Sequence, residues 1–394
     1  MTYKTVILKK DREDPIKNKH HWIFSGAIAK IPSFSDGEIM AVESHYGDFL
    51  GYGYFNSKTD IAGRMINFDK TDPIVALRNN IKACIELRKF YYKGHKEITA
   101  HRLINGEGDA VPGLTVDRYE DVLVLQSSTA GIDALKPTII EILLELYNHP
   151  ISCIYERSNM PSRIREGLAP TEGVLYGEKK ESVIIVEHGI KYNVDIVNGQ
   201  KTGLFLDMEE NKKLIMENSL DRNVLNCFSY VGGFSLSALK GGAKKVTSVD
   251  ISENSIKRSK QNFELNGYDP TKHDFIVADA FDFLRDQETL DYNLIILDPP
   301  SFAKRREEVE SAKRGYHEIN KTTFSKMPKD SFLLTCSCSY HIDELTFDRI
   351  IAKSAKDAKR EIRLVSRHRL AHDHPINLYH PEFNYLKSLF IYVV

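Results

Sequence analysis

The sequence predicts an α/β protein whose C-terminal part is a doubly wound parallel sheet, preceded by a small β-rich unit and a central α+β unit. From Asn223 onward, apolar strands alternate with helices, which is typical of a parallel sheet covered on both faces. Residues 1–71 instead contain short strands separated by turn-rich pieces. We therefore divide the 394 residues into the ranges 1–71, 72–187 and 188–394.

Composition favours a cytoplasmic protein. No run approaches the roughly 18 apolar residues that a membrane-spanning helix needs, and the polar N-terminus does not resemble a signal peptide. Five cysteines are few for this length, so we expect reduced thiols. The formal net charge of −1 gives no sign of a nucleic-acid partner. Basic residues do cluster in 1–30 and 353–369, but either cluster alone is more often a solvated face.

The first unit is predicted from four short strands at Val6–Leu8, Ile39–Val42, Phe49–Phe55 and Ile61–Ile66. Trp22 is the only tryptophan and follows a polar, basic segment of helical character. We expect its ring to anchor the core of this unit. Small closed β-units with basic loops often bind RNA, although composition alone does not establish that activity.

The central unit begins with a helix that Asp72 and Pro73 start and that continues through Tyr92. A second helix is predicted over Ile132–Tyr147, and strands at His101–Asn105, Leu114–Arg118, Val122–Ser127, Cys153–Arg157 and Val183–Glu187. Arg102 and Asp117 lie near strand ends, where they could contact substrate or form an ion pair. A hairpin over His188–Ile196 leads into the last unit.

The parallel sheet of the last unit is predicted from five strands, Val224–Phe228, Val246–Asp250, Phe275–Ala278, Leu294–Leu297 and Ser331–Cys336, and from Leu389–Val394, which closes it. A helix follows each of the second and third strands, and Ser252 suits the N-cap of the first of these helices. Pro299 and Pro300 end the fourth strand, because proline cannot donate a ladder hydrogen bond. Asp298 is thereby left at the carboxyl end of a central strand, where open α/β sheets bind ligands.

Acidic residues follow three of these strands: Asp250, Asp279 and Asp298. The first strand ends instead in the small-residue turn Phe228–Gly233. The sequence lacks both G-x-G-x-x-G and G-x-x-x-x-G-K-[ST], so an adenosine ligand without phosphates fits better than a dinucleotide. We predict S-adenosylmethionine, with Asp250 on the ribose, Asp279 on the adenine amino group and the turn on the methionine end. The alternative is that these acids only cap helices or end strands.

Cys336 and Cys338 lie at the end of the fifth strand, beside the strand that Asp298 follows. A thiol there is a candidate nucleophile: its attack on C6 of cytosine would activate C5 for methylation, with Asp298 at N3. Metal binding is the alternative, but Cys84, Cys153 and Cys227 are scattered, so we expect no metal site. Of Cys336 and Cys338, we expect one to face the sheet's mouth and the other a core layer. The sequence does not show what activates the thiol.

Over essentially its whole length, the chain resembles the bacterial 5-methylcytosine methyltransferases of large-subunit (23S) ribosomal RNA. The motifs that carry the resemblance are His21–Gly26, Gly106–Arg118, Lys201–Gly203 with Leu206 and Asp207, Asn226–Phe234, Asp298–Phe302, Arg314–Tyr316 and Ser337–Ser339. The resemblance implies an N-terminal PUA domain, a central α+β domain and a C-terminal Rossmann-like class I methyltransferase domain.

The resemblance also implies that Cys338 is the nucleophile and that Cys336 belongs to the core. With the strand-end argument, the predicted cofactor site comprises Lys201, Thr202, Asp207, Phe228, Ser229, Gly232, Gly233, Asp250, Asp279, Asp298 and Pro299. Met208 and Glu209 stand where the family usually has Gln-Arg. Asp373–Pro375 matches a late family motif whose role the sequence does not give.

The predicted function is therefore S-adenosylmethionine-dependent methylation of cytosine C5 in 23S rRNA. Ribosomal RNA is the expected partner, with no membrane and no metal, and edges of the β-rich units could support a homodimer. One alternative is an RNA methyltransferase that acts on a purine nitrogen without covalent catalysis. Another is a catalytically inactive RNA-binding or ribosome-assembly protein. The missing dinucleotide fingerprint disfavours a dehydrogenase.

Overall fold

The computed structural model describes residues 3–95 and 97–394, and internal contacts divide the chain into two units. Unit 1 contains the chain up to Ile185 together with Asn193–Leu206 and His372–Phe383. Unit 2 contains Val186–Tyr192, Asp207–Ala371 and Asn384–Val394. The predicted domain boundaries near residues 72 and 188 stay predictions.

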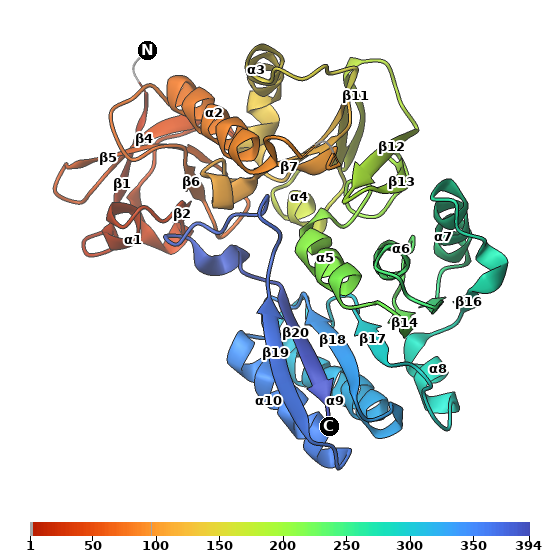
Figure 1. Cartoon of the computed structure of the whole chain (residues 1–394). Coiled ribbons are helices and arrows are strands. Elements are labelled where there is room, and N and C mark those ends of the chain that lie inside the picture. Colours follow the sequence, from red (N-terminus) through yellow and green to blue (C-terminus); the bar gives the residue numbers. More distant parts are fainter. Residues whose placement is uncertain (1–2, 96) are drawn as a thin grey trace. The chain divides into compact units, whose positions relative to one another are not determined.

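The first sheet of unit 1 has six strands in the order β2-β6-β5-β4-β1-β3, in which β1 and β4 pair parallel (Figure 1). The strands are β1 (Thr5–Leu8), β2 (Trp22–Ile23), β3 (Ile28–Lys30), β4 (Ile39–Glu43), β5 (Phe49–Phe55) and β6 (Gly63–Met65), and the short helix α1 spans Asp14–Lys17. All four predicted strands are present. β2 and β3 are additional, because two or three residues are too few to show an alternating pattern.

The second sheet of unit 1 has the order β11-β10-β9-β8-β7. Its strands are β7 (Ala100–Asn105), β8 (Leu114–Tyr119), β9 (Val122–Ser127), β10 (Cys153–Ser158) and β11 (Thr171–Gly177), and the helices are α2 (Pro73–Tyr92), α3 (Ala130–Leu146) and α4 (Pro161–Arg165). Asp72 caps α2 as expected, since its Oδ1 accepts from the backbone N–H of Ile74 (2.9 Å). Apolar residues of α2 and α3, such as Ile81 and Ile139, share one core with this sheet.

Trp22 does not anchor the core of the first sheet, contrary to the prediction. The side chain is only half-buried, and its Nε1 donates to Glu107 Oε1 (2.9 Å). The indole lies edge-on to His380, with ring centroids 4.4 Å apart. A tryptophan with a polar tip fits such a half-polar environment better than a fully apolar core. Aliphatic and sulfur-containing side chains fill the core instead, including Val6, Leu8, Met40, Val42 and Met65.

The late motif at Asp373 has a structural role in unit 1. Asp373 Oδ2 accepts from Arg102 N (2.6 Å), and Oδ1 pairs with His374 Nδ1 (2.6 Å). Arg88 donates to the Asp373 carbonyl (2.7 Å) and to both carboxylate oxygens of Asp109. Burial alone would raise the pKa of Asp373, but His374 and the Arg102 N–H outweigh it and the pKa is lowered. The motif therefore joins a buried network of charges on α2 and β7.

Arg102 and Asp117 form the ion pair that is one of the two interpretations of these strand-end residues (Nε–Oδ1 2.8 Å), and a substrate contact stays a prediction. The same carboxylate accepts from Thr202 Oγ1 (2.6 Å), which also contacts Tyr119 OH (2.8 Å). Thr202, a predicted cofactor residue, is fully buried within this chain of hydrogen bonds.

Unit 2 contains the predicted doubly wound sheet, in the order β16-β15-β14-β17-β18-β20-β19 (Figure 1). Its strands are β14 (Asn223–Cys227), β15 (Lys245–Asp250), β16 (Asp274–Val277), β17 (Leu294–Leu297), β18 (Ser331–Ser337), β19 (Ile362–His368) and β20 (Lys387–Val393). The helices are α5 (Glu209–Glu217), α6 (Gly233–Lys240), α7 (Glu253–Leu265), α8 (Ala280–Asp286), α9 (Val309–Lys326) and α10 (Glu344–Asp357). The hairpin of β12 (Ser182–Glu187) and β13 (Ile190–Asp195) is a separate two-stranded sheet whose residues are divided between the two units.

The topology of this sheet fixes where a ligand would bind. β14 to β18 run parallel, whereas β20 runs antiparallel to β18 and β19. Strand order reverses at β14, between β15 and β17, and open α/β sheets bind ligands at the carboxyl ends of the strands at such a switch point. Residues of α8, α9 and α10, among them Leu284, Tyr316 and Phe347, pack on the core of one sheet face. Among the described residues, no helix is both long and apolar enough to cross a membrane.

Candidate active site

The turn after β14 adopts a conformation that is costly for its side chains. Phe228 and Tyr230 have φ of 60° and 47°, in the left-handed region, and Gly232 has a φ of 86°. Non-glycine residues there cost on the order of 1–3 kcal/mol each, so surrounding contacts must hold them. Ser229 N donates to the Val249 carbonyl (3.0 Å), and a Cβ at position 232 would collide with Ser259 Oγ. The turn is therefore locked between β15 and α7, with its backbone at the switch point.

One side chain of this turn indicates a missing ligand. Ser229 is buried, and its Oγ has no hydrogen-bond partner among the described residues. A buried hydroxyl without a partner costs about 1–3 kcal/mol, so such groups are usually paired. A polar ligand at the strand ends would supply the partner.

The carboxylate of Asp250 hydrogen-bonds both the turn after β14 and the segment that begins α7. Its Oδ2 accepts from Tyr230 N (2.8 Å), and its Oδ1 accepts from Ser252 N (2.9 Å). Ser252 caps α7 as predicted. Each carboxylate oxygen can accept a further hydrogen bond. Asp250 therefore has a structural role in the turn. Its oxygens could still accept from a ribose, and that contact stays a prediction.

Asp279 is the N-cap of α8. Its Oδ1 accepts from Phe281 N (2.8 Å) and from Asp282 N (3.2 Å). β15 and β16 pair parallel with Asp250 opposite Val277, so both acids lie at the same edge of the sheet. Asp279 therefore has a capping role, and its predicted contact with an adenine amino group stays a prediction.

The remaining predicted cofactor residues fall in different parts of the chain. Lys201 and Thr202 belong to unit 1, whereas Asp207 belongs to unit 2 and its Oδ2 accepts from Tyr385 OH (2.6 Å). The family departure at Glu209 has a local explanation, because this side chain pairs with His188 (3.0 Å) and raises the pKa of His188. Asp207 therefore belongs to the same unit as the strand-end residues, whereas Lys201 and Thr202 belong to the other unit.

Cys338 lies beside the Asp298-Pro299-Pro300 turn. β17 and β18 pair parallel with Leu297 opposite Thr335, so the segments that follow both strands lie level with each other. Cys338 Sγ donates to the Pro299 carbonyl (3.8 Å). The side chain is partly exposed, whereas Cys84, Cys153, Cys227 and Cys336 are buried. Cys338 is thus the accessible thiol at the mouth of the sheet.

Cys336 is fully buried and belongs to the core, as predicted. Residues two apart point to the same face of a strand, so alternation does not separate Cys336 from Cys338. The separation arises because β18 ends at Ser337, which leaves Cys338 outside the strand. Burial raises the pKa of Cys336 well above its usual value, and a buried neutral thiol is a poor nucleophile.

Ser339 fastens the Asp-Pro-Pro turn to the segment that carries Cys338. Its Oγ hydrogen-bonds Ser301 Oγ (3.1 Å) and Tyr316 OH (2.9 Å) and accepts from Ala303 N (3.2 Å). The aromatic ring of Phe302 packs on Tyr316, with centroids 4.6 Å apart. The partly buried Phe302 ring therefore supports the turn by packing on α9.

Lys387 is a residue of this region that the sequence argument did not identify. It lies opposite Ser337 in the β18–β20 pair, and its Nζ donates to the carbonyls of Ser339 (2.6 Å) and Tyr385 (2.8 Å). The sequence feature that could have pointed to Lys387 is its place at the start of a strand whose other residues are mostly apolar. Its position beside Cys338 depends on strand pairing between segments about 50 residues apart, which one sequence does not show.

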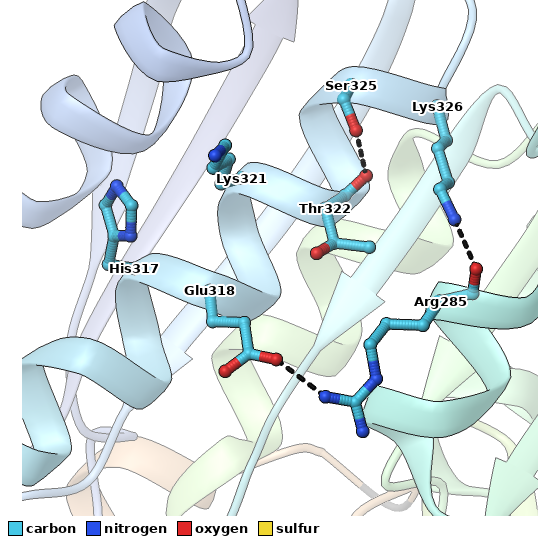
Figure 2. A pocket seen from close by; sticks show the side chains of 7 residues that line it. All are labelled: Arg285, His317, Glu318, Lys321, Thr322, Ser325 and Lys326. Carbon is cyan, nitrogen blue, oxygen red and sulfur yellow. Dashed lines mark hydrogen bonds and ion pairs between the residues drawn. The ribbon is translucent and has the colours of Figure 1, made fainter.

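A surface hollow on α8 and α9 lies among seven residues, six of which are polar or charged residues of α9 (Figure 2). Two of its basic groups already have partners: Arg285 pairs with Glu318 (2.8 Å), and Lys326 donates to carbonyls that include Leu284 (2.9 Å) and Gln287 (2.6 Å). None of the predicted site residues lines this hollow.

His20, His380 and Glu382 of unit 1 lie close enough to approach one metal ion. Trp22 N donates to His20 Nδ1 (3.1 Å), so the proton of a neutral His20 ring lies on Nε2, which contacts Glu382 Oε1 (3.1 Å). A protonated ring nitrogen offers no lone pair to a metal. We therefore assign this cluster a hydrogen-bonding role.

Comparisons with known proteins agree with this architecture. Residues 6–68 match a PUA-like domain, and residues 160–374 match an S-adenosylmethionine-dependent methyltransferase. Proteins named ribosomal RNA large subunit methyltransferase I are similar over the full length: that of Aliivibrio fischeri strain MJ11 is 38% identical, covering 99% of each chain. The Vibrio parahaemolyticus protein is 39% identical, covering 97% of this chain and 98% of its own.

Two solved structures share the fold over the whole length. A protein from Streptococcus mutans described as an S-adenosylmethionine-dependent methyltransferase is 25% identical, with a TM-score of 0.83 over 99% of this chain and 100% of its own. A methyltransferase complexed with SAH is 26% identical, with a TM-score of 0.84 over 100% of both chains.

Proposed function

Because the chain belongs to the ribosomal RNA large subunit methyltransferase I family of S-adenosylmethionine-dependent enzymes, we propose that it methylates C5 of a cytosine in 23S rRNA. The observation that carries this proposal is the partly exposed Cys338 thiol beside the Asp298-Pro299-Pro300 turn. Methylation of a ring nitrogen needs no such thiol.

The strand-end residues fit S-adenosylmethionine. The Ser229 hydroxyl lacks a partner among the described residues, and the left-handed turn brings its backbone to the switch point. In our proposal, this turn holds the methionine end, Asp250 accepts from the ribose hydroxyls and Asp279 accepts from the adenine amino group. When bound, S-adenosylmethionine supplies an electrophilic methyl group.

Cys338 and Asp298 would act on the cytosine. The Cys338 thiolate bonds to C6, and the electron pair of the C5–C6 double bond becomes nucleophilic at C5. The protonated carboxyl group of Asp298 donates a hydrogen bond, or its proton, to N3 and so stabilises the negative charge that the ring takes up when the thiolate adds. Once C5 carries the methyl group, loss of the C5 proton restores the double bond and expels the thiolate. The enzyme thus recovers Cys338 in its starting form.

Identification of the methylated nucleoside tests the proposal directly. The purified protein is incubated with labelled S-adenosylmethionine and with 23S rRNA from cells that lack this enzyme, and the RNA is then digested to nucleosides. We expect the label in 5-methylcytidine. Label in guanosine or adenosine would favour the methyltransferase that acts on a purine nitrogen. RNA binding without any incorporation would favour the inactive RNA-binding protein.

Asp250→Ala should weaken cofactor binding by about 10- to 100-fold, because charge-assisted hydrogen bonds contribute roughly 1.5–3 kcal/mol. The substitution removes the acceptor of Tyr230 N, which shapes the turn, together with the proposed ribose contact. The dissociation constant of SAH is measured by titration calorimetry.

Asp274→Ala is the matched control, because this acid lies at the amino end of β16, far along the strand from the ligand edge, and pairs with Lys245 (2.8 Å). We expect it to bind SAH like the unmodified protein. An unchanged dissociation constant in Asp250→Ala would remove Asp250 from the proposed cofactor site.

A further inference from the structure

Lys387 places a buried cation next to the segment that carries Cys338. The residue is 7% exposed, and the hydrogen bonds of its Nζ go to the carbonyls of Ser339 and Tyr385. Carbonyl oxygens satisfy donors but carry no formal charge. A buried ammonium group that is solvated only by neutral acceptors costs several kcal/mol unless an anion lies near.

Three groups favour the charged form of Lys387: Cys338 first, then Asp343 and Glu344. Both carboxylates have other partners, because Asp343 caps α10 by accepting from Thr346 N (2.6 Å) and Glu344 pairs with Arg369 (2.9 Å). Burial still prevails and lowers the pKa of Lys387 to about 8. A thiolate at Cys338 is therefore the anion that favours the ammonium form of Lys387 most strongly.

Two other titratable side chains that interact with Cys338, Tyr316 and Cys336, do not supply a positive charge. Burial raises the pKa of Tyr316, on α9, to about 12, and it also raises the pKa of Cys336, on β18, so both are neutral near pH 7. Asp298, which interacts with neighbouring Cys336, is an acid and would oppose a nearby thiolate when ionised. Lys387 is the cation in this group of side chains.

We propose that Lys387 is a positioning residue that stabilises the Cys338 thiolate and fixes the Ser337–Ser339 segment against the Asp-Pro-Pro turn. The proposal rests on the proposed function, since a thiolate here matters to a cysteine that attacks cytosine. Attraction between two charges is reciprocal: a thiolate that favours the ammonium form is itself favoured by that ammonium group. Lys387 is therefore the group that activates the thiol, which the sequence alone did not identify.

Alkylation of Cys338 as a function of pH tests the proposal without RNA or cofactor. The full chain reacts with iodoacetamide, with Cys338→Ala as the background, because the four other cysteines are buried. In Lys387→Met, we expect the midpoint of the rate profile to rise by about one pH unit, and the rate at pH 7 to fall about tenfold. Lys387→Arg keeps a positive charge and should restore most of the profile.

Lys326→Met is the matched control, because Lys326 also donates its Nζ to backbone carbonyls in unit 2 but has no contact with the Cys338 segment among the described hydrogen bonds. Thermal unfolding checks that each variant is folded. Lys387→Gln, which keeps a donor without the charge, replaces Lys387→Met if that variant unfolds. An alkylation profile equal to that of the unmodified protein in a folded, uncharged variant would overturn the proposal.

Methylation assays separate this proposal from the proposed function. We expect the pH profile of methylation in Lys387→Met to move in the same direction as the alkylation profile, with activity recovering as the pH rises. If Cys338→Ala retains full activity, the proposed function fails while a shifted alkylation profile still supports the pairing of Lys387 with the thiol. If Cys338→Ala is inactive but the alkylation profile of Lys387→Met does not move, the proposed function stands and only the role of Lys387 is overturned.

Discussion

Cys338→Ala should lower the rate of 5-methylcytosine formation by about 10³-fold or more, since covalent activation of C5 is lost with the thiol. Binding of SAH should change little, because Cys338 follows β18 and the proposed cofactor residues follow β14, β15 and β16. The measurement is single-turnover methyl transfer to undermodified 23S rRNA, with product identified as the nucleoside. An active Cys338→Ala enzyme would exclude the thiolate mechanism.

Cys336→Ala is the matched control for this experiment. It removes a thiol two residues away that is fully buried and whose pKa burial raises, so we expect the methylation rate to stay within a few-fold. RNA that carries 5-fluorocytosine provides a second readout. Fluorine at C5 cannot leave as a proton does, so the adduct to Cys338 should persist and be absent from Cys338→Ala. Failure to trap any protein–RNA adduct in the active enzyme would contradict covalent catalysis.

The sheet that carries the site could be predicted because its signals are local. Two prolines end β17 at Leu297, as expected, and alternation of apolar strands with helices marks β14 to β18. Segments that depend on distant partners escaped prediction. β11 is an edge strand with no fully buried residue, so its pattern of burial is weak. Asp373 hydrogen-bonds Arg102 of β7, which lies 271 positions earlier in the sequence. No local pattern encodes such pairings.

The candidate site could be predicted by residue type but not by role. Asp250 and Asp279 follow strands and precede helices, where both a ligand contact and a helix cap call for a short acidic side chain. The structure shows that Asp279 caps α8 and that Asp250 accepts from the N–H of Ser252, the cap of α7. The ligand contacts need a bound cofactor to be tested. Lys387 was missed for the opposite reason: its type is unremarkable, and only its pairing opposite Ser337 gives it a neighbour to act on.

Asp298→Asn should reduce methyl transfer by about 10²-fold or more, within the range that a positioned acid or base contributes. An amide can still donate a hydrogen bond to N3, but it cannot supply a proton or carry the charge of the carboxyl group. The rate is measured by single-turnover methyl transfer to undermodified 23S rRNA, as for Cys338→Ala. Ser301→Ala is the control within the same turn, because it removes a hydroxyl that bonds Ser339 (3.1 Å) and leaves the carboxyl group in place.

Two further measurements decide how Asp298 acts. If the loss arose from a less reactive thiol, alkylation of Cys338 would slow in Asp298→Asn; we expect no slowing, because removing a negative charge does not disfavour a thiolate. If Asp298 and Cys338 serve the same adduct, the double variant should be no slower than Cys338→Ala alone, since residues that act as a unit are not additive. If the two substitutions instead lower the rate additively, Asp298 belongs to the cofactor site. The affinity of the Asp298→Asn protein for SAH should then fall.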